Sequence, residues 1–329
     1  MKQIKLAHGN GGVENNHLIQ SVFYKSFSNS ILAQNEDSAI LENEKLAFCT
    51  DSFTVSPIFF KGGDIGKLSI CGTCNDLAMV GASPKYLSFS VVIEEGFLFE
   101  DLEKIVDSAK KEIELNGAIV VTGDTKVMPK NSLDKIIINT SAIGELSGHK
   151  LNSKHIQEED VVMISGDIGR HGAVIFAQRE GMEISSNLES DCKSLFPIVN
   201  DVLSNSHEVV TMRDATRGGV SAVLNEWAKA SNVCIEIEDD KLVVCDEVQG
   251  LCELLGFEAL SLANEGTFLI VVKKTEANKI LEILKKYNQF ASIIGTVTSK
   301  YPSRVVLKSS WGTSRFLDAP TGELLPRIC

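Results

Sequence analysis

The sequence predicts an α/β protein made of two regions, and three observations support this. In the first region, short apolar stretches typical of strands alternate with segments of helical periodicity. A second α/β region runs from "DVVMISGDIG" to about "SRVVLKSS". Between them, around residues 146–156, the apolar pattern lapses, which indicates a linker. We therefore expect a first domain over 1–150, a second over 151–310 and a tail over 311–329.

The elements of the first region follow in order. "ILAQNEDSAILENEKLAFCTDSF" predicts two strands joined at a charged turn. In "DIGKLSICGTCNDLAMVGA" the residues Ile65, Leu68, Gly72 and Met79 recur at helical spacing. "YLSFSVVIEE" predicts a strand, and "FEDLEKIVDSAKKEIELNG" an amphipathic helix closed by Gly117. "AIVVTGDTKV" and "KIIINTSAIGEL" predict two further strands.

The composition is that of a soluble globular protein, with 43% apolar and 23% charged residues. The net charge of -12 argues against nucleic-acid or anionic-membrane partners. No apolar run approaches the ~18 residues of a membrane span, and "MKQIKLAHGNGG" lacks the apolar core of a signal peptide. We expect a cytoplasmic protein whose eight cysteines are mostly reduced core thiols.

The chain ends in "APTGELLPRIC", where two prolines and a glycine predict an extended tail. Chain ends are usually frayed and solvated. The thiol of Cys329 is therefore either a sequence accident or a reactive group on a movable arm. Trp311 and Phe316 are expected to anchor the base of this tail.

Five aspartates stand where apolar elements meet polar turns: Asp37, Asp51, Asp76, Asp124 and Asp214. Carboxylates at the ends of buried elements are costly unless they are paired or bind cations. If they converge, they form an oxygen-rich site suited to Mg²⁺ that bridges carboxylates and substrate phosphates. A single such aspartate is more often a turn or helix-cap residue; five in these contexts favour a common site, although spacing alone does not prove convergence.

Glycine-rich stretches supply the complementary half of such a site. "HGNGG" at 8–12, "SGDIGRHGA" at 165–173 and "RDATRGG" at 213–219 can expose backbone N–H groups to an anion, or they are ordinary tight turns. His8 and His171 in these stretches either contact phosphate or are hydrogen-bonded loop residues. "GGDIGK" is not a Walker loop, because Lys61 stands where a glycine is needed. "CGTC" at 71–74 lacks further ligands and lies inside a helix, so Cys74 is expected to pack in the core.

Several motifs together resemble the hydrogenase maturation factor family HypE. They are "HGNGG", "TDSFTVSPIFFKGGDIGKLSICGTCNDLAMVGA", "VVTGDTKV", "RDATRGGV", "NEGT" and the terminal "PRIC", in this order along nearly the whole chain. The aspartate motifs are shared by the wider PurM-like ATP-binding superfamily, whereas "PRIC" is specific to the family. One departure is Lys61 in place of an expected proline. The resemblance implies a two-domain fold: an N-terminal mixed sheet that forms a barrel in a homodimer, a C-terminal α+β sandwich, and a mobile tail.

The resemblance also implies an activity, a carbamoyl dehydratase. In the family, the terminal cysteine, here Cys329, receives a carbamoyl group from the carbamoyltransferase HypF. ATP then drives dehydration of the S-carboxamide to a thiocyanate. This is the source of cyanide for the iron of [NiFe] hydrogenase, accepted by a HypC–HypD complex.

Roles for individual residues follow from the same resemblance. ATP and Mg²⁺ are the implied cofactors, and Asp76 and Asp124 the foremost metal ligands. Glu265 in "NEGT" and Lys126 in "GDTK" are placed beside the thiocarbamate nitrogen, with Glu265 as a base of raised pKa. A strand-edge position for Glu265 and a phosphate contact for Lys126 remain open. The residues implied to bind the nucleotide and its metal are Asp37, Asp51, Asp76, Asp124, Asp214, Gly11, Gly12, Asn75 and Gly218.

Two alternatives compete with this interpretation. The first is another PurM-like enzyme, such as a selenophosphate synthetase or a thiamine-monophosphate kinase. A selenophosphate synthetase would carry a reactive cysteine near its glycine-rich loop, which "HGNGG" lacks. A thiamine-monophosphate kinase needs no terminal thiol. The second alternative is a non-catalytic maturation scaffold, which has no need of a metal–phosphate site. ATP hydrolysis distinguishes a scaffold from an enzyme.

Overall fold

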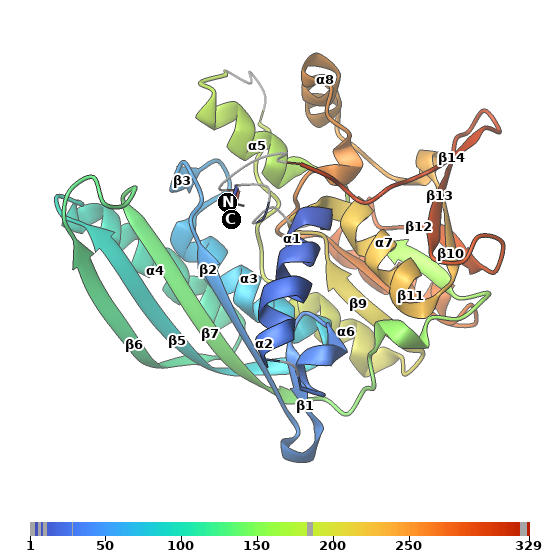
Figure 1. Cartoon of the computed structure of the whole chain (residues 1–329), viewed down its shortest axis with the longest axis horizontal. Coiled ribbons are helices and arrows are strands. Elements are labelled where there is room, and N and C mark those ends of the chain that lie inside the picture. Colours follow the sequence, from blue (N-terminus) through green and yellow to red (C-terminus); the bar gives the residue numbers. More distant parts are fainter. Residues whose placement is uncertain (1–3, 6–7, 9–11, 28, 183–186, 323–327) are drawn as a thin grey trace.

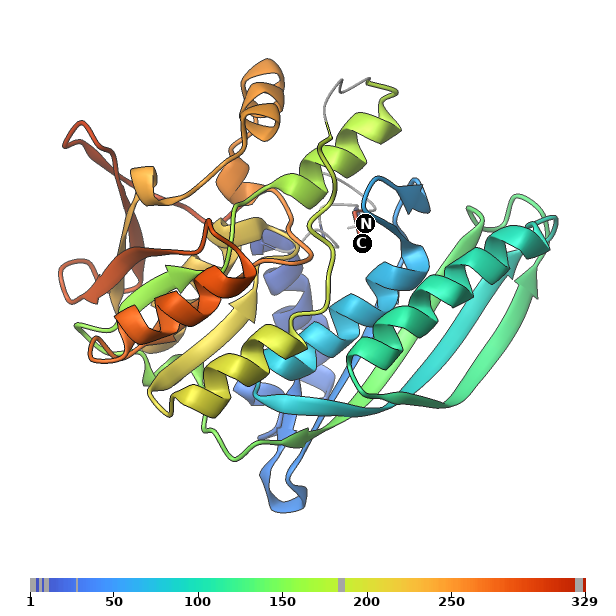
Figure 2. The ribbon, with the colours of Figure 1, turned by 180° about the vertical axis from the view of Figure 1, so that it is seen from behind.

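The chain folds around two β-sheets that lie side by side (Figures 1 and 2). This computed structural model describes residues 4–5, 8, 12–27, 29–182, 187–322 and 328–329. The end of the chain at Cys329 lies between the two halves of the molecule (Figure 1). No helix in these ranges is long and apolar enough to cross a membrane. The division into domains at residues 150 and 310 stays a prediction.

The N-terminal sheet has the strand order β1-β2-β7-β5-β6. Its strands are β1 (Ala39–Leu41), β2 (Leu46–Phe53), β7 (Ile136–Leu146), β5 (Ala82–Glu94) and β6 (Ile119–Met128). β5 and β6 run parallel and the other neighbours antiparallel, which confirms the expected mixed sheet. The two strands β1 and β2 are joined at a charged turn, as the sequence predicts.

Two helices, α3 (Ile65–Met79) and α4 (Phe99–Leu115), pack together beside this sheet. Asp64 caps α3 by accepting hydrogen bonds from the backbone N–H groups of Gly66 and Lys67. Nearly every residue of α3 is buried, because the helix lies between the two halves of the molecule. α4 is amphipathic and ends just before Gly117, whose φ is +65°.

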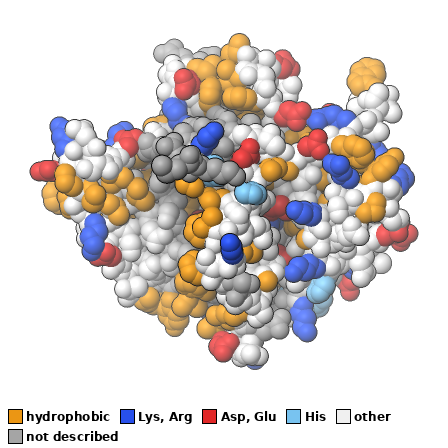
Figure 3. All heavy atoms as spheres, in the orientation of Figure 1, with side chains coloured by type: hydrophobic (Ala, Val, Ile, Leu, Met, Phe, Trp, Pro, Cys, Tyr) orange, Lys and Arg blue, Asp and Glu red, His pale blue; other side chains and the backbone are white. Residues whose placement is uncertain are grey.

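Among the residues that the structure describes, no α-helix packs on the opposite face of the N-terminal sheet. Phe48, Tyr86 and Ile143 are exposed there. Figure 3 has this face toward the viewer and shows exposed hydrophobic side chains on it. The edge strand β6 is exposed along its whole length.

The C-terminal sheet has the strand order β14-β13-β10-β12-β8-β11-β9. Its strands are β14 (Ser314–Phe316), β13 (Arg304–Lys308), β10 (Cys234–Glu238), β12 (Ser292–Thr298), β8 (Val161–Ile164), β11 (Phe268–Val272) and β9 (Val209–Asp214). The helices of this half are α5 (Arg170–Arg179), α6 (Phe196–Asn205), α7 (Gly219–Ser231), α8 (Asp246–Leu255) and α9 (Ala277–Tyr287).

Helices cover both faces of this sheet, which explains the uninterrupted apolar sequences of β8 and β11. In β11, Phe268 and Ile270 pack into the cluster formed with α6 and α9. Leu269 and Val271 pack on the other side, against α7. A strand buried on both faces has no polar alternation. This arrangement confirms the expected α+β sandwich.

Short elements complete the structure. Near the N-terminus they are α1 (Gly12–Leu18), the π-helical turn η2 (Ile19–Tyr24), α2 (Lys25–Phe27), η3 (Leu32–Gln34) and η4 (Glu42–Glu44). Further on they are the hairpin of β3 (Phe59–Phe60) and β4 (Gly63–Asp64), and the 3₁₀ turns η5 (Ser153–His155), η6 (Asp239–Lys241) and η7 (Ala259–Ser261).

The first residues of the predicted tail form part of the C-terminal sheet. β14, at residues 314–316, pairs with β13, so the expected extended segment does not start at residue 311. Trp311 is 91% exposed and does not anchor the tail, because it lies in the turn between these two strands. Phe316 packs edge-on against Tyr301 and beneath Arg304. The anchors of the tail base are instead buried Leu317 and hydrogen bonds to α7.

Candidate functional site

Three of the five predicted aspartates come together where the two halves of the molecule meet. Asp51 lies near the end of β2, Asp76 in α3 and Asp214 at the end of β9. α3 contacts both of these strands, which brings the three carboxyl groups within electrostatic reach of one another. The predicted convergence therefore holds for these three residues.

The carboxyl groups of this cluster resist ionisation. Burial, reinforced by the charges of Asp51 and Asp214, raises the pKa of Asp76 well above its usual range. Burial raises the pKa of Asp214 to about 7, although Arg213 opposes the shift. The Oδ2 atom of Asp214 is buried without a hydrogen-bond partner. Such a cluster is stabilised by a cation, because a bound positive charge offsets both desolvation and mutual repulsion.

Mg²⁺ fits this chemistry. In the described part of the chain, no three His, Cys, Asp or Glu side chains are arranged as ligands of one metal ion. Mg²⁺ does not need such a cage, because it commonly takes one or two carboxylates and completes its shell with water and substrate phosphates. The unpartnered oxygen of Asp214 beside Asp51 and Asp76 offers such a partial ligand set.

Asp37 has a different partner. Its carboxylate forms an ion pair with Arg213 at 2.6 Å, and Arg213 also pairs with Glu226 at 2.8 Å. The charge of Asp37 still contributes to the raised pKa of Asp76. In this structure Asp37 is thus committed to a guanidinium rather than open to a metal ion.

Asp124 lies on the opposite face of the N-terminal sheet. The paired residues Asp51, Thr140, Phe89 and Gly123 form one row across β2, β7, β5 and β6, and side chains in such a row share a face. Successive residues of a strand point to opposite faces, so Asp124 points away from the face of Asp51. Within one chain, Asp124 therefore does not join the other aspartates.

Lys126 lies two residues after Asp124 in β6 and points to the same face of the sheet. Its ammonium group is exposed and pairs with Asp124 at 2.8 Å. This ion pair lowers the pKa of Asp124. β6 lies at the outer edge of the sheet, away from β9 (Figure 1). The expected placement of Lys126 beside the reacting group is not met within a single chain.

Glu265 is fixed in the buried loop that precedes β11. Asp191 accepts hydrogen bonds from the backbone N–H groups of Glu265 and Gly266, at 3.1 and 3.0 Å. Asn264 accepts from the N–H of Gly169 at 2.7 Å, which ties the loop to the start of α5. Gly266 has no room for a side chain, since a Cβ would lie 1.8 Å from the carbonyl oxygen of Asp191.

Glu265 is 2% exposed, and the Oε1 atom of its carboxyl group has no hydrogen-bond partner. Burial, with the charges of Cys192 and Asp214, raises its pKa well above the usual range. Glu265 is thus a buried residue near the aspartate cluster, and the strand-edge surface alternative is excluded.

Cys329 reaches the same cluster from the far end of the chain. Its half-buried thiol lies where burial raises the pKa to about 12. Arg217 opposes this shift, while Glu265, Asp51 and Asp214 add to it. The pKa of Arg217 is itself raised, chiefly by Cys329. The terminal thiol, a cationic side chain, a buried carboxyl group and the aspartate cluster therefore form one site.

The remaining predicted site residues that the structure describes make contacts that hold the fold together. Gly11 lies outside the described residues. Gly12 and Gly218 both have positive φ and both lie against Pro320, at the base of the tail. Asn75 is buried, and its amide bridges the backbone of Lys193 and Leu195, which joins α3 to the C-terminal half.

Comparison with known proteins agrees with this architecture. The N-terminal domain model of the AIR synthase related proteins matches residues 35–146, and the C-terminal domain model matches residues 157–308. Over the full length of both proteins, the chain is 41% identical to carbamoyl dehydratase HypE of Escherichia coli K12. The chain belongs to the HypE family.

Solved HypE structures have the same fold. HypE in a complex with HypF aligns with a TM-score of 0.88 at 42% identity, covering 92% of this chain and 99% of that chain. HypE in complex with ATP aligns with a TM-score of 0.84 at 37% identity, covering 99% and 100%. The PurM-like two-domain fold predicted from the motifs is thereby confirmed.

Two residues of this HypE site, Arg217 and Asp191, were not singled out from the sequence. Arg217 stands within "RDATRGG", where a lone arginine between an aspartate and two glycines was an available signal. Asp191 lies in a stretch without periodicity, and nothing in the sequence connects it to Glu265. For His171 the sequence left open a phosphate contact or a hydrogen-bonded loop position. It lies in the first turn of α5, and its ring is hydrogen-bonded to Ser190 and to the tail, so it is not a phosphate contact in this structure.

The raised carboxyl pKa values make a prediction about stability. A group whose pKa is higher in the folded than in the unfolded state stabilises the fold at low pH and loses that contribution as pH rises through the folded value. Without divalent cations, replacing Asp214 by asparagine should increase the free energy of unfolding at pH 8 by about 2 to 4 kcal/mol more than at pH 4. Urea unfolding of both proteins from pH 4 to pH 8 measures this difference, and parallel curves would contradict it.

Proposed function

We propose that this HypE family member catalyses the ATP-dependent dehydration of a carbamoyl group carried on its own Cys329, giving a thiocyanate. One observation carries the proposal: the terminal thiol lies in the same site as Glu265 and the aspartate cluster. A tail that only bound a partner protein would not need to end beside the buried carboxyl oxygens of Asp214 and Glu265, which have no hydrogen-bond partner. This placement favours an enzyme over a scaffold.

The chemistry requires activation of a poor leaving group. The carboxamide oxygen attacks the γ-phosphorus of ATP, and ADP leaves. The nitrogen then loses both of its protons, the C–O bond to the phosphoryl oxygen breaks, and inorganic phosphate departs as the C≡N bond forms. The sum is S-carboxamide plus ATP to thiocyanate, ADP, hydrogen phosphate and one proton, which the base passes to solvent. A base is needed at the nitrogen throughout.

Glu265 is the candidate for that base. Its unpartnered Oε1 can accept a proton, and the raised pKa makes it a stronger base than an exposed glutamate. Arg217, which interacts electrostatically with both Glu265 and Cys329, is placed to offset negative charge on the activated carboxamide. Asp51, Asp76 and Asp214 would hold Mg²⁺, which neutralises charge on the phosphates when bound.

The tail is proposed to visit two sites. A relative has been solved as a HypE–HypF complex, and we propose HypF as the source of the carbamoyl group here. The eleven residues 319–329 span up to ~36 Å when extended, enough to leave this site and reach a partner. A HypC–HypD complex is the proposed acceptor of the cyanide.

We also propose a homodimer formed through the helix-free face of the N-terminal sheet. Phe48, Tyr86 and Ile143 are exposed on this face, and the adjoining edge strand β6 is exposed along all ten of its residues, which makes both available for pairing. Asp124 and Lys126 belong to this surface, so they are proposed to act on a nucleotide held by the other copy. This would account for their position away from Asp51 in a single chain.

Mixed dimers test this arrangement. Asp76→Asn and Asp124→Asn should each be inactive alone. The two variants are then mixed in equal amounts and allowed to exchange subunits. If Asp124 serves the other copy, half of the dimers are mixed and each mixed dimer has one complete site of two, so about a quarter of wild-type activity should return. No recovery, with subunit exchange shown by labelled chains, would place both residues in the same site of one chain.

Phosphate release tests the reaction itself. Purified protein should release phosphate from ATP slowly. After carbamoylation by HypF, it should release one phosphate per carbamoylated tail in a rapid single turnover. Release that is independent of carbamoylation would favour a different PurM-like ATP enzyme. No release despite nucleotide binding would favour the scaffold.

A further inference from the structure

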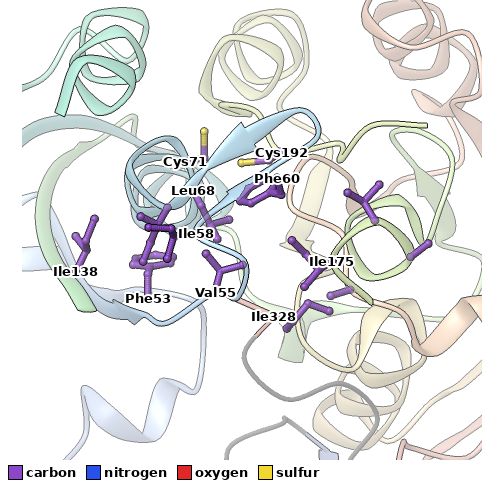
Figure 4. Close-up of a cluster of buried hydrophobic side chains, with 14 of the residues drawn as sticks. Phe53, Val55, Ile58, Phe60, Leu68, Cys71, Ile138, Ile175, Cys192 and Ile328 are labelled. Atoms are coloured by element: carbon purple, nitrogen blue, oxygen red, sulfur yellow. The ribbon is translucent and has the colours of Figure 1, made fainter. Parts of the chain in front are cut away.

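The last two residues of the chain are held by a small set of specific contacts. The side chain of Ile328 is 4% exposed and belongs to the cluster that contains Val55 and Ile175 (Figure 4). The backbone N–H and the hydroxyl of Thr54 both donate to the carboxyl-terminal oxygen of Cys329, at 3.2 and 3.3 Å. His171 contacts the carbonyl oxygen of Ile328 at 2.7 Å.

His171 is completely buried and held on three sides. It lies in the first turn of α5, and its ring packs edge-on against Phe60 at 5.4 Å. Its Nδ1 is 2.8 Å from the hydroxyl of Ser190. That hydroxyl oxygen also accepts the backbone N–H of Cys192, at 3.1 Å.

These contacts fix the direction of every hydrogen bond. The carbonyl of Ile328 can only accept, so the Nε2 atom of His171 must carry the proton. Burial lowers the pKa of His171, which favours the neutral ring with a single N–H. Nδ1 then accepts from the hydroxyl of Ser190, whose oxygen accepts from Cys192. The result is a one-way chain of donors that ends at the tail.

We propose that His171, oriented by Ser190, is a positioning residue that docks the tail tip and thereby places the thiol of Cys329 at Glu265 and Arg217. The contact is one hydrogen bond between a fixed ring and the penultimate carbonyl, so it sets the depth to which the tail inserts. It is backbone-directed, and it therefore works for the free, the carbamoylated and the dehydrated forms of Cys329 alike. That docking serves to place Cys329 for dehydration rests on the proposed function. That His171 holds the tail tip does not.

The test measures how accessible Cys329 is, without ATP or any partner. N-ethylmaleimide is added to the full-length protein, and peptide mass spectrometry follows the modification of each cysteine. His171→Phe, which keeps an aromatic ring but removes the donor, should speed modification of Cys329 about tenfold. Ser190→Ala should act in the same direction, because it releases the ring orientation. His171→Gln keeps an N–H donor and should restore slow modification in part.

Two controls separate docking from general loosening. Cys245, which is also half-buried but lies at the start of α8, serves as the internal reference and should keep its rate. His155→Phe, at an exposed histidine, should leave Cys329 unchanged. Equal acceleration of Cys329 and Cys245 in His171→Phe, or no acceleration of either, would overturn the proposal.

A second measurement covers the case in which His171→Phe folds poorly. The destabilisation caused by His171→Gln is measured by urea unfolding in the full-length chain and in a chain ending at residue 327. If His171 acts through the tail, most of the effect should vanish in the shortened chain. A full effect in both chains would show that His171 only supports the core. Neither the modification rate of Cys329 nor the urea unfolding depends on catalysis, so both results would stand even if the dehydratase proposal failed.

Discussion

Replacing Cys329 by alanine is expected to abolish the ATP-driven reaction while leaving fold and nucleotide binding intact. The sulfur of Cys329 is the atom that carries the carbamoyl group. The other seven cysteines lie within the folded chain and not on the tail. Removing a half-buried thiol should change the free energy of unfolding by less than about 1 kcal/mol. ADP formation after incubation with HypF, carbamoyl phosphate and ATP measures the loss, and urea unfolding measures the stability.

The matched control is Cys245→Ala, which removes another half-buried thiol. It should carry out the reaction at the wild-type rate. Turnover that persists in Cys329→Ala would show that the carbamoyl group is accepted elsewhere, and the role of the tail would then have to be abandoned.

Replacing Glu265 by glutamine should slow dehydration by about 10² to 10⁴ while leaving carbamoylation by HypF unaffected. Glutamine keeps the size of the side chain but cannot take a proton from the carboxamide nitrogen. Burial raises the pKa of Glu265, so the wild-type rate should increase with pH well above the range in which an ordinary glutamate titrates, about 4.3. This limb of the pH profile should disappear in Glu265→Gln.

Glu258→Gln is the matched control, because Glu258 is exposed and paired with Arg315 at 2.8 Å. Its rate and pH profile should match the wild type. An unchanged pH limb in Glu265→Gln would mean that another group takes the proton, with Asp214 the next candidate by its own raised pKa.

Local sequence patterns were sufficient for most of the fold. α4 was predictable from its periodicity and from Gly117, and β1 and β2 from their charged turn. The start of the tail was not predictable, because β14 is a three-residue strand that is defined by its pairing with β13. Such a strand is defined by a partner rather than by its own residues.

The site was predictable only in part, for reasons of geometry. Asp51 and Asp214 lie near the ends of strands β2 and β9, so their positions at element ends were visible in the sequence. The separation of Asp124 depends on the pleat of β6 and on pairing across four strands, which no local pattern encodes. Asp191 and His171 act through contacts with segments far along the chain, and spacing gives no signal for these.

Intact-protein mass spectrometry tests the central claim most directly. The protein is incubated with HypF, carbamoyl phosphate and ATP, and wild type is compared with Cys329→Ala and Glu265→Gln. We predict that wild type gains one carbamoyl group and then loses one water, that Glu265→Gln stops at the carbamoylated mass, and that Cys329→Ala stays unmodified. A wild type that remains unmodified, while HypF is active on another acceptor, would contradict the assignment of Cys329 as the site of cyanide synthesis.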